Sequence, residues 1–375
     1  MTAPLRDERV LIIGSGVSFH NVRTLRADDP ETVTPAAPAR GGGPRPAQIP
    51  KSASVLGSVQ SVFWLGGTGA RSSEALASVH RSGNAQMKKI LCATDFSLRS
   101  ELAVDRAAAL ARRFGAELVL LHAVDDDQPR PMVDRRCDDA REALVARVAN
   151  VREWGQLDAT VEVRVGTAFV AILEAARTSN AELIVMGAHR RRLLRDVVAG
   201  TTIERVLRTG GHPVLMVNTA TLVDYQSVLV ALDASEASAR ALRVAKALGM
   251  LDGMRVSVVH AFEPIYKGMM SWTGVREDSV AKYSAAWARE ASTELYRFLE
   301  SNGLADTVRN LELEDGLPFP SIKRVVERSR PHLLVIGTRG HSGVKRLLLG
   351  SVAERVLNEI ECDILAVPPM SQGDG

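Results

Sequence analysis

Aromatic residues are scarce in this chain: they make up 4% of its 375 residues, whereas hydrophobic residues of all kinds make up 46%. A packed core must therefore be built mainly from Ala, Val and Leu. An excess of one charge is also lacking, because 47 basic and 44 acidic residues leave a formal net charge of +3. This near balance gives no electrostatic reason to expect nucleic acid as the main partner.

Cysteines and long apolar runs are few as well. The three cysteines, Cys92, Cys137 and Cys362, form no Cys-x-x-Cys motif, which argues against a secreted disulfide framework and for a reducing compartment. No apolar run reaches the ~20 residues that cross a membrane. The N-terminal run VLIIG lacks the long apolar region of a signal peptide. These absences predict a soluble, cytoplasmic protein.

Composition changes sharply near residue 87. Residues 24–86 are rich in Pro, Gly, Ala, Ser and Arg, a composition that buries little apolar surface, so we expect this segment to be largely disordered. From Met87 onward the sequence becomes periodic. At ~100–200 residues per domain, the length predicts two or three domains.

The periodic part contains an internal repeat. Residues 88–124 align with residues 226–262, and in each copy a short apolar run ends in Asp, with a Ser two residues and a His 27 residues later: Asp95, Ser97 and His122, then Asp233, Ser235 and His260. A Gly pair spaced by 13 follows in both copies, at Gly187 and Gly200, then at Gly337 and Gly350. The glycines are offset by 150 residues and the aspartates by 138, so the second copy carries 12 extra residues, which we place around 264–278.

Each copy alternates short apolar runs with helical patterns. The expected strands lie near 89–94, 117–123, 160–165, 182–187 and 213–217, then near 227–232, 255–261, 308–313, 332–337 and 363–367. The intervening helices carry Ala, Leu and Val at helical spacing. This alternation predicts an α/β fold, with two tandem, doubly wound, parallel-sheet domains at 87–219 and 225–370 after an N-terminal extension at 1–86.

A glycine pattern follows one of the expected strands in the second copy. Residues 337–351 read GTRGHSGVKRLLLGS, after the apolar run LLVI and before the helical pattern VAERVLNEI. Ligands of open parallel sheets bind beyond the carboxyl ends of the strands. Glycines let a backbone approach a phosphate closely, and a helix N-terminus favours an anion; Ser351 adds a hydroxyl and is a good N-cap. Each glycine alone is explained by turn chemistry, but the whole spacing together with Asp233 favours a nucleotide site.

These motifs resemble the universal stress protein (UspA-like) family, whose nucleotide-binding members carry G-x2-G-x9-G-[ST]. The segment 337–351 has this spacing, and VLVALDAS is similar to the family's first-strand Asp motif. The resemblance covers about 87–370 as a tandem pair. It implies adenine nucleotide α-hydrolase-like (Rossmann-like) domains that bind ATP, with or without Mg²⁺, and that act in stress adaptation with slow hydrolysis at most.

The resemblance also implies which residues of the second copy meet the nucleotide. Asp233 is expected on the ribose or adenine side. The other residues implied are Ala231, Leu232 and Ala261 in the base pocket, Gly337, Arg339 and Gly340 at the phosphates, and Gly350, Ser351 and Val352 at the remaining side of the phosphate cradle.

The first copy departs from this pattern. Its segment GAHRRRLLRDVVAGT keeps Gly187, Gly200 and Thr201, and Asp95 precedes it, but Arg190 replaces the second glycine. A side chain there would crowd a phosphate, so nucleotide binding by this copy is left open. The arginines at 190–192 and 195 either hold phosphate through their side chains or form a solvated basic loop, the interpretation we prefer.

Other residues have competing interpretations. Asp95 and Asp233 could act as bases or cap the next helix, and we favour ligand contact with capping. His122 and His260 are expected to be structural, and no further His or carboxylate at ligand spacing predicts a metal site. Cys92 is expected to be inert core. In the family the last strands, here 213–217 and 364–368, often pair copies or protomers, so we expect pairing within this chain and leave a homodimer open.

Three functions remain open. The main hypothesis is an ATP-binding, nucleotide-dependent stress regulator with an unknown protein partner and no catalytic residues. The alternatives are a slow ATPase or nucleotidyl-transfer enzyme, for which the loop offers no convincing metal-binding carboxylate or base, and a stress scaffold that binds no nucleotide.

The N-terminal residues pose a separate question. Residues 9–26, RVLIIGSGVSFHNVRTLR, resemble the GSG-x3-HN segment of class III extradiol dioxygenases, in which that His is catalytic. The rest of that fold and its metal ligands are missing, so His20 is not expected to be catalytic. We interpret 1–86 as a fusion remnant or an over-extended start, with Met87 as the candidate natural start.

Overall fold

The computed structural model describes residues 14–15, 18–19, 87–152, 156–188, 200–220, 223–262, 277–340 and 349–369. The chain divides into two units, Met1–Ser82 and Gly83–Gly375. In the first unit, β1 (Gly14–Ser15) pairs antiparallel with β2 (Ser18–Phe19). The segment 24–86, for which the composition predicts disorder, and His20 lie outside the described residues.

The second unit contains both copies of the repeat. The first copy consists of β3 (Lys89–Ala93), α1 (Leu98–Phe114), β4 (Glu117–Val124), α2 (Arg130–Arg152), β5 (Ala159–Val165), α3 (Ala168–Ser179), β6 (Leu183–Gly187), α4 (Thr202–Thr209) and β7 (Val214–Val217). The second consists of β8 (Ser227–Ala231), α5 (Glu236–Ala247), β9 (Arg255–Phe262), α7 (Glu277–Ser301), the 3-10 helix η2 (Ala305–Thr307), β10 (Asn310–Asp315), α8 (Pro318–Ser329), β11 (Leu333–Gly337), α9 (Ser351–Glu359) and β12 (Asp363–Val367). Every expected strand is present, and the 12 extra residues expected around 264–278 fall almost wholly outside the described part.

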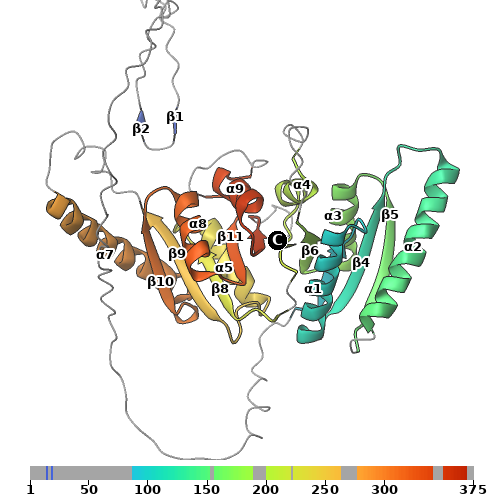
Figure 1. The fold of residues 1–375 in the computed structure, drawn as a ribbon, viewed down its shortest axis with the longest axis horizontal. Coiled ribbons are helices and arrows are strands. Elements are labelled where there is room, and N and C mark those ends of the chain that lie inside the picture. Colours follow the sequence, from blue (N-terminus) through green and yellow to red (C-terminus); the bar gives the residue numbers. More distant parts are fainter. Residues whose placement is uncertain are drawn as a thin grey trace, which may run out of the picture. The chain divides into compact units, whose positions relative to one another are not determined.

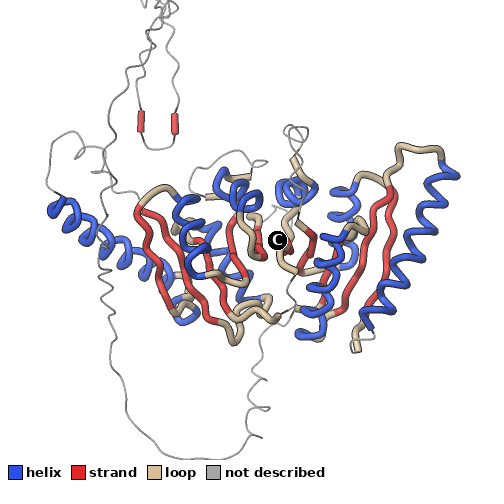
Figure 2. The backbone as a smooth tube through the Cα atoms, in the orientation of Figure 1, coloured by secondary structure: helices blue, strands red, loops and turns tan. Residues whose placement is uncertain are grey.

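The strands of both copies form one sheet of ten strands in the order β10-β9-β8-β11-β12-β7-β6-β3-β4-β5 (Figures 1 and 2). All neighbours are parallel except β7 and β12, which pair antiparallel with Ile364 opposite Met216. The last strands of the two copies therefore pair within one chain, as the sequence predicts. Backbone pairing of β7 with β12 thus joins the two copies into one sheet, in addition to the side-chain contacts between them.

Side chains alternate between the two faces of the sheet and build a core on each. In β3, Ile90 and Cys92 belong to one core and Leu91 to the other, as the two-residue period of a strand requires. Helices α1, α2, α5 and α7 contribute to the first core, and α3, α4, α8 and α9 to the second. Since each core contains residues of both copies, unfolding one copy would expose apolar surface of the other.

A buried polar cluster lies where the copies join. Asp363, at the start of β12, is 0% exposed, and its Oδ2 accepts a 2.7 Å hydrogen bond from the Tyr225 hydroxyl. Its Oδ1 accepts from the backbone N–H groups of Asn218 and Thr219 at 2.9 and 3.0 Å. Arg106 of α1 completes the cluster, with Nε 3.3 Å from Oδ2 and its guanidinium 4.6 Å from the Tyr225 ring centre. The buried carboxylate is thus matched by donors from the first copy and from Tyr225, which lies just before β8.

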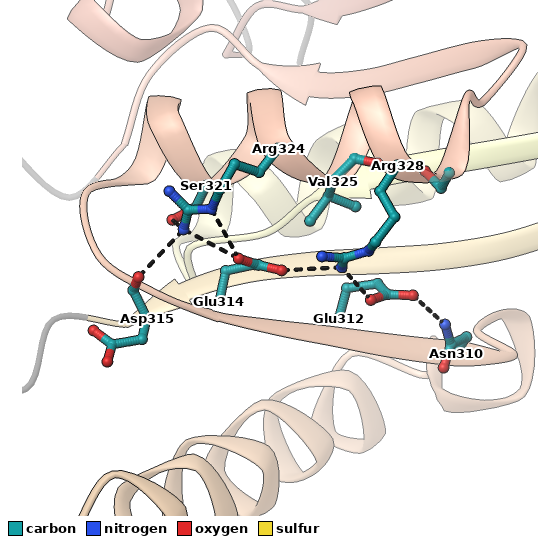
Figure 3. A network of polar contacts seen from close by, with 9 residues as sticks. Asn310, Glu312, Glu314, Asp315, Ser321, Arg324, Val325 and Arg328 are labelled. Atoms are coloured by element: carbon teal, nitrogen blue, oxygen red, sulfur yellow. Dashed lines mark hydrogen bonds and ion pairs between the residues drawn. The ribbon is translucent and has the colours of Figure 1, made fainter. Parts of the chain in front are cut away.

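The edge strand β10 carries acidic side chains that α8 neutralises (Figure 3). Arg324 Nη2 lies 3.1 Å from Glu314 Oε2, and Arg328 Nη2 lies 2.8 Å from Glu312 Oε2 and 2.9 Å from Glu314 Oε1. Charged side chains on an edge strand oppose unwanted pairing with other chains. This network therefore both attaches α8 to the edge and protects that edge.

Candidate functional site

The sheet topology places the motifs of each copy at a point where the strand order reverses. β8 lies between β9 and β11, and Ala231 at its end is opposite Ile336 of β11. Asp233 therefore follows β8 directly beside Gly337, which ends β11. β3 and β6 have the same relationship in the first copy, with Ala93 opposite Met186. Ligands of open α/β sheets bind at such points, beyond the carboxyl ends of the strands.

The aspartates after β3 and β8 brace a turn and do not cap the following helix. Asp233 Oδ1 accepts a 3.0 Å hydrogen bond from the Ser235 N–H, and Asp95 Oδ1 accepts one of 3.0 Å from the Ser97 N–H. Ser97 and Ser235 are the N-caps of α1 and α5. The capping role expected for the aspartates is therefore wrong: the serine two residues later has it, because a β-region residue adjoining the helix is needed there.

The residue between each Asp and Ser adopts a left-handed backbone. Phe96 has φ 58° and Ala234 has φ 59°, a conformation that costs energy for residues other than glycine. The same strain at equivalent positions of two copies points to a shared requirement, namely the tight turn in which the Asp carboxylate accepts from the Ser N–H two residues later. The sequence analysis did not identify these two residues, although the Asp-x-Ser spacing marks them.

Hydrogen bonds keep Asp95 ionised. Its partial burial raises the pKa, but hydrogen bonds from Ser97 and Ser100 outweigh this and hold the pKa of the carboxyl below its ordinary value. Asp95 is therefore a carboxylate at neutral pH, able to accept hydrogen bonds from a ligand.

The two repeated histidines hold the strand ends together. His122 Nδ1 lies 2.9 Å from the Thr94 carbonyl oxygen, and His260 Nδ1 lies 2.8 Å from the Leu232 carbonyl oxygen. Both contacts tie the second strand of a copy to the turn that follows its first strand. This geometry matches the structural role expected from the sequence.

The base-pocket residues implied by the family resemblance lie together at the ends of β8 and β9. Ala231 is buried at the end of β8 and Ala261 is half-buried near the end of β9. Leu232 is only 3% exposed, its N–H donates to the Val259 carbonyl oxygen at 3.0 Å, and its own carbonyl meets His260. Leu232 therefore holds the ends of β8 and β9 together through its backbone groups.

The first glycine of each motif allows a helix to pack against a strand end. A Cβ atom on Gly337 would lie 2.9 Å from the Ala237 carbonyl oxygen of α5, and one on Gly187 would lie 2.5 Å from the Arg99 carbonyl oxygen of α1. Both contacts are too short for a real side chain. Close approach to a helix backbone is thus sufficient reason for these two glycines.

The second glycine of the intact motif lies close to the aspartate that follows β8 in the same copy. A Cβ atom on Gly340 would lie 2.7 Å from Asp233 Oδ2. Any larger residue at 340 must displace the carboxylate or the loop. The structure therefore brings together two residues that lie far apart in the sequence and that the motif analysis assigned to one site.

The start of α9 differs from the sequence expectation. Gly350, and not Ser351, is the N-cap, and within the described residues no side chain caps this helix start. Ser351 is exposed as the first helical residue, and Val352 is half-buried behind it. The Gly350 N–H donates to the Thr338 carbonyl oxygen at 2.9 Å, which holds the helix start beside half-exposed Arg339. The start of α9 thus lies beside Thr338 and Arg339, and no described side chain caps it.

The start of α4 in the first copy is capped by its own side chains. Thr201 Oγ1 accepts from the Glu204 N–H at 3.2 Å, and Glu204 Oε2 accepts from the Thr201 N–H at 3.1 Å. This is a complete capping box. Gly200 adjoins it with φ 71°, a left-handed conformation that favours glycine.

The first copy also contains a cavity of about 480 Å³ at the carboxyl ends of its strands. Asp95, Gly187 and Thr201, which the sequence assigned to a site, all line it. Apolar residues form much of the remaining wall, among them Leu121, Ile172 and Met186. Cavities of this size hold small organic ligands.

Several residues named in the sequence analysis cannot be placed. Arg190, the arginines at 191, 192 and 195, and the loop residues 341–348 lie outside the described part of the chain. Among the described residues, no group of three or more His, Cys, Asp or Glu side chains could hold a metal ion. No described helix is both long enough and apolar enough to cross a membrane.

Comparison with known proteins identifies the family. A family model described as the universal stress protein family matches residues 87–218 and 224–368. A universal stress protein of Thermus aquaticus is 30% identical over 146 residues, 38% of this chain and 98% of that protein. A universal stress protein of Mycobacterium tuberculosis is 25% identical over 296 residues, 74% of this chain and 95% of its own. The crystal structure of a universal stress protein from Archaeoglobus fulgidus shares the fold, with a TM-score of 0.57 and 21% identity over 76% of this chain and 99% of that one. The chain belongs to the universal stress protein family, with the family model matching it twice in tandem.

Proposed function

We propose that the second copy binds an adenine nucleotide, ATP, and that the protein is a nucleotide-dependent regulator of stress adaptation in the cytoplasm. The observation that carries this proposal is that the Asp233 carboxylate lies where a side chain on Gly340 would begin, together with a helix start that no described side chain caps. This arrangement offers an acceptor for sugar hydroxyls and donors for phosphate within one site.

The phosphate end of this site would be formed by backbone groups. The first N–H groups of a helix lack intrahelical partners, and the helix dipole favours an anion there. In α9 these groups belong to Ser351 and the residues after it, and the acidic residue of this first turn, Glu354, is exposed. Gly340 keeps the facing loop free of a side chain, so a phosphate can approach both backbones.

The nucleoside end would be formed by Asp233 and the ends of β8 and β9. Carboxylates at the ends of such strands accept hydrogen bonds from ribose hydroxyls in other doubly wound folds. Ala231 and Ala261 leave room for a flat base because their side chains are small. Mg²⁺ would enter with the phosphates, which supply oxygen ligands of the kind that it prefers.

Thermal unfolding of the full chain with and without ATP and Mg²⁺ tests this function. A ligand that binds only the folded state at 100 times its Kd stabilises that state by about 2.7 kcal/mol. We expect this stabilisation in the parent and its loss in Gly340→Arg, which places a side chain against Asp233. The matched control is Gln156→Arg, which adds the same charge at an exposed residue away from the site. Equal stabilisation of the parent and Gly340→Arg would contradict the proposal.

A further inference from the structure

The two copies of the repeat differ at the one place where a phosphate would bind a helix. α4 and α9 occupy equivalent positions, and each has a glutamate in its first turn, Glu204 and Glu354. Glu204 is 5% exposed, whereas Glu354 is exposed to solvent. The same residue type therefore has two different environments in one chain.

The Glu204 carboxylate occupies the start of α4. Its Oε2 lies 3.1 Å from the Thr201 backbone nitrogen and 3.5 Å from Arg208 Nη2. The same oxygen would lie 2.6 Å from a Cβ atom on Gly200. Its Oε1 lies 3.5 Å from Asn358 Nδ2 of α9. The carboxylate is thus fixed against the glycine and the helix amide that would otherwise form an anion cradle.

Among the described residues of the second copy, no side chain caps the equivalent helix start. Around Gly350, the atoms nearest to an added Cβ are backbone atoms of Thr338 and Arg339, at 3.2 Å and beyond. Glu354 faces solvent, and Gly350 contributes no capping side chain. A phosphate would therefore meet a helix start that no described side chain caps in the second copy, and a carboxylate in the first.

The first copy nevertheless keeps a cavity of about 480 Å³, lined in part by Thr201, Thr202 and Ile203 of this helix start. Its polar wall includes the ionised Asp95 and the hydroxyl groups of Thr94 and Ser100. The Phe96 ring, with its centre 4.5 Å from that of His122, adds an exposed aromatic face at the same strand end. These groups suit a flat ring with hydroxyl substituents. Asp95 and Arg99 bring one charge of each sign to the cavity lining, so the exclusion of a phosphate is assigned to Glu204 at the helix start.

We propose that the first copy is a second ligand site, for an uncharged nucleoside-like ring compound, and that Glu204 excludes phosphorylated forms from it. The Glu204 carboxylate takes the position of a phosphate at the helix start, so that a nucleotide must displace a buried, hydrogen-bonded acid. One chain would then bind two kinds of ligand, a nucleotide in the second copy and a phosphate-free ligand in the first. This inference does not depend on whether the second copy binds ATP.

Isothermal titration of the full chain with adenosine and with ATP tests the ligand class. Asp95→Asn keeps the side-chain shape but removes the charge from the first copy, and Asp233→Asn does the same in the second. We expect adenosine affinity to fall at least tenfold in Asp95→Asn and to remain in Asp233→Asn. In a Gly340→Arg background, we expect ATP to bind the first copy at least tenfold more weakly than adenosine. ATP binding as tight as adenosine there, or no adenosine binding, overturns the proposal.

Glu204→Gln tests the excluding residue. Glutamine also completes a capping box, so this change keeps the helix start while removing the negative charge. In the Gly340→Arg background we expect ATP affinity to rise at least tenfold and adenosine affinity to stay the same. Glu354→Gln, the equivalent change in the second copy, is expected to alter neither. An unchanged ratio of ATP to adenosine affinity in Glu204→Gln, with the same unfolding midpoint, would show that Glu204 does not exclude phosphorylated ligands.

ATP binding by the second copy is measured separately in Asp95→Asn, so failure of one site does not obscure the other.

Discussion

The Tyr225 hydroxyl donates a 2.7 Å hydrogen bond to Asp363 Oδ2, although the two residues are 138 positions apart in the sequence. Tyr225 lies at the start of the second copy, just before β8, and Asp363 begins the last strand of that copy. Arg106 of the first copy lies 3.3 Å from the same oxygen. This cluster connects both copies at the antiparallel junction of β7 and β12, so it should control whether they unfold together.

Asp363→Ala is expected to destabilise the protein strongly. The change leaves the buried Arg106 guanidinium without its carboxylate, and breaking a buried pair in this way costs about 3–5 kcal/mol. Urea unfolding measures the loss. Asp138→Ala is the control, because Asp138 pairs with Arg141 at 3.4 Å while 80% exposed, and such pairs contribute about 0–1 kcal/mol. Similar losses in the two variants would contradict the role of the cluster.

Stability should fall above pH 10 in part through Tyr225. Burial, then the neighbouring Asp363 carboxylate, raises the pKa of Tyr225 well above its ordinary value of 10.0. Because the folded-state pKa is the higher one, the unfolded chain loses this proton first as the pH rises. The contribution of Tyr225 to the free energy of unfolding is therefore fully present below pH 10. Above pH 10 this contribution declines by up to about 1.4 kcal/mol per pH unit.

Tyr225→Phe isolates this contribution. The variant is expected to be less stable than the parent at pH 8, by about 1–3 kcal/mol, because Asp363 loses a donor. Its stability should also decline less steeply between pH 10 and 11, since one titrating group has gone. Urea unfolding at several pH values measures both effects, and parallel declines in parent and variant would show that Tyr225 does not titrate as described.

The cysteines should react with alkylating reagents in a defined order. Burial raises the pKa of Cys362 to about 12, with the Asp363 carboxylate adding to the effect, and burial raises the pKa of Cys92 as well. Only the thiolate is a good nucleophile. At pH 8 we expect half-buried Cys137 to be modified first and Cys92 only after unfolding in urea. Mass spectrometry of peptides reads the order, and rapid labelling of Cys92 in the native protein would contradict it.

The two edge strands carry the same ion pair with opposite polarity. In the first copy Arg164 of β5 lies 3.4 Å from Glu174 of α3, whereas in the second Glu314 of β10 lies 3.1 Å from Arg324 of α8. Glu314→Arg should destabilise by about 1 kcal/mol, because it opposes two arginines at a partly exposed site. Adding Arg324→Glu and Arg328→Thr reproduces the pattern of the first copy, in which Arg164 donates to Thr178 at 2.7 Å. This triple variant is expected to recover the stability of the parent in urea unfolding, and no recovery would show that the pairs are not interchangeable.

The sequence predicts the strands and the sheet class because short apolar runs and helical periods are local signals. It also predicts that Asp233 and the glycine motif share a site, since both follow strands that a doubly wound sheet makes adjacent. The environments of Glu204 and Glu354 could not be predicted. Thr201-x-x-Glu204 and Ser351-x-x-Glu354 both read as capping boxes, but only the first forms. The buried contact of Tyr225 with Asp363 likewise depends on tertiary packing that no local pattern records.

Mass spectrometry of the nucleotide released from the purified full chain tests the central claim most directly. The parent should release ATP, and Gly340→Arg should release little, because a side chain at 340 displaces the Asp233 carboxylate expected to hold the ribose and crowds the backbone expected to bind the phosphates. Release from Gln156→Arg should equal that of the parent. If neither the parent nor the control releases nucleotide, and added ATP fails to bind them, the second copy is no nucleotide site and the account is contradicted.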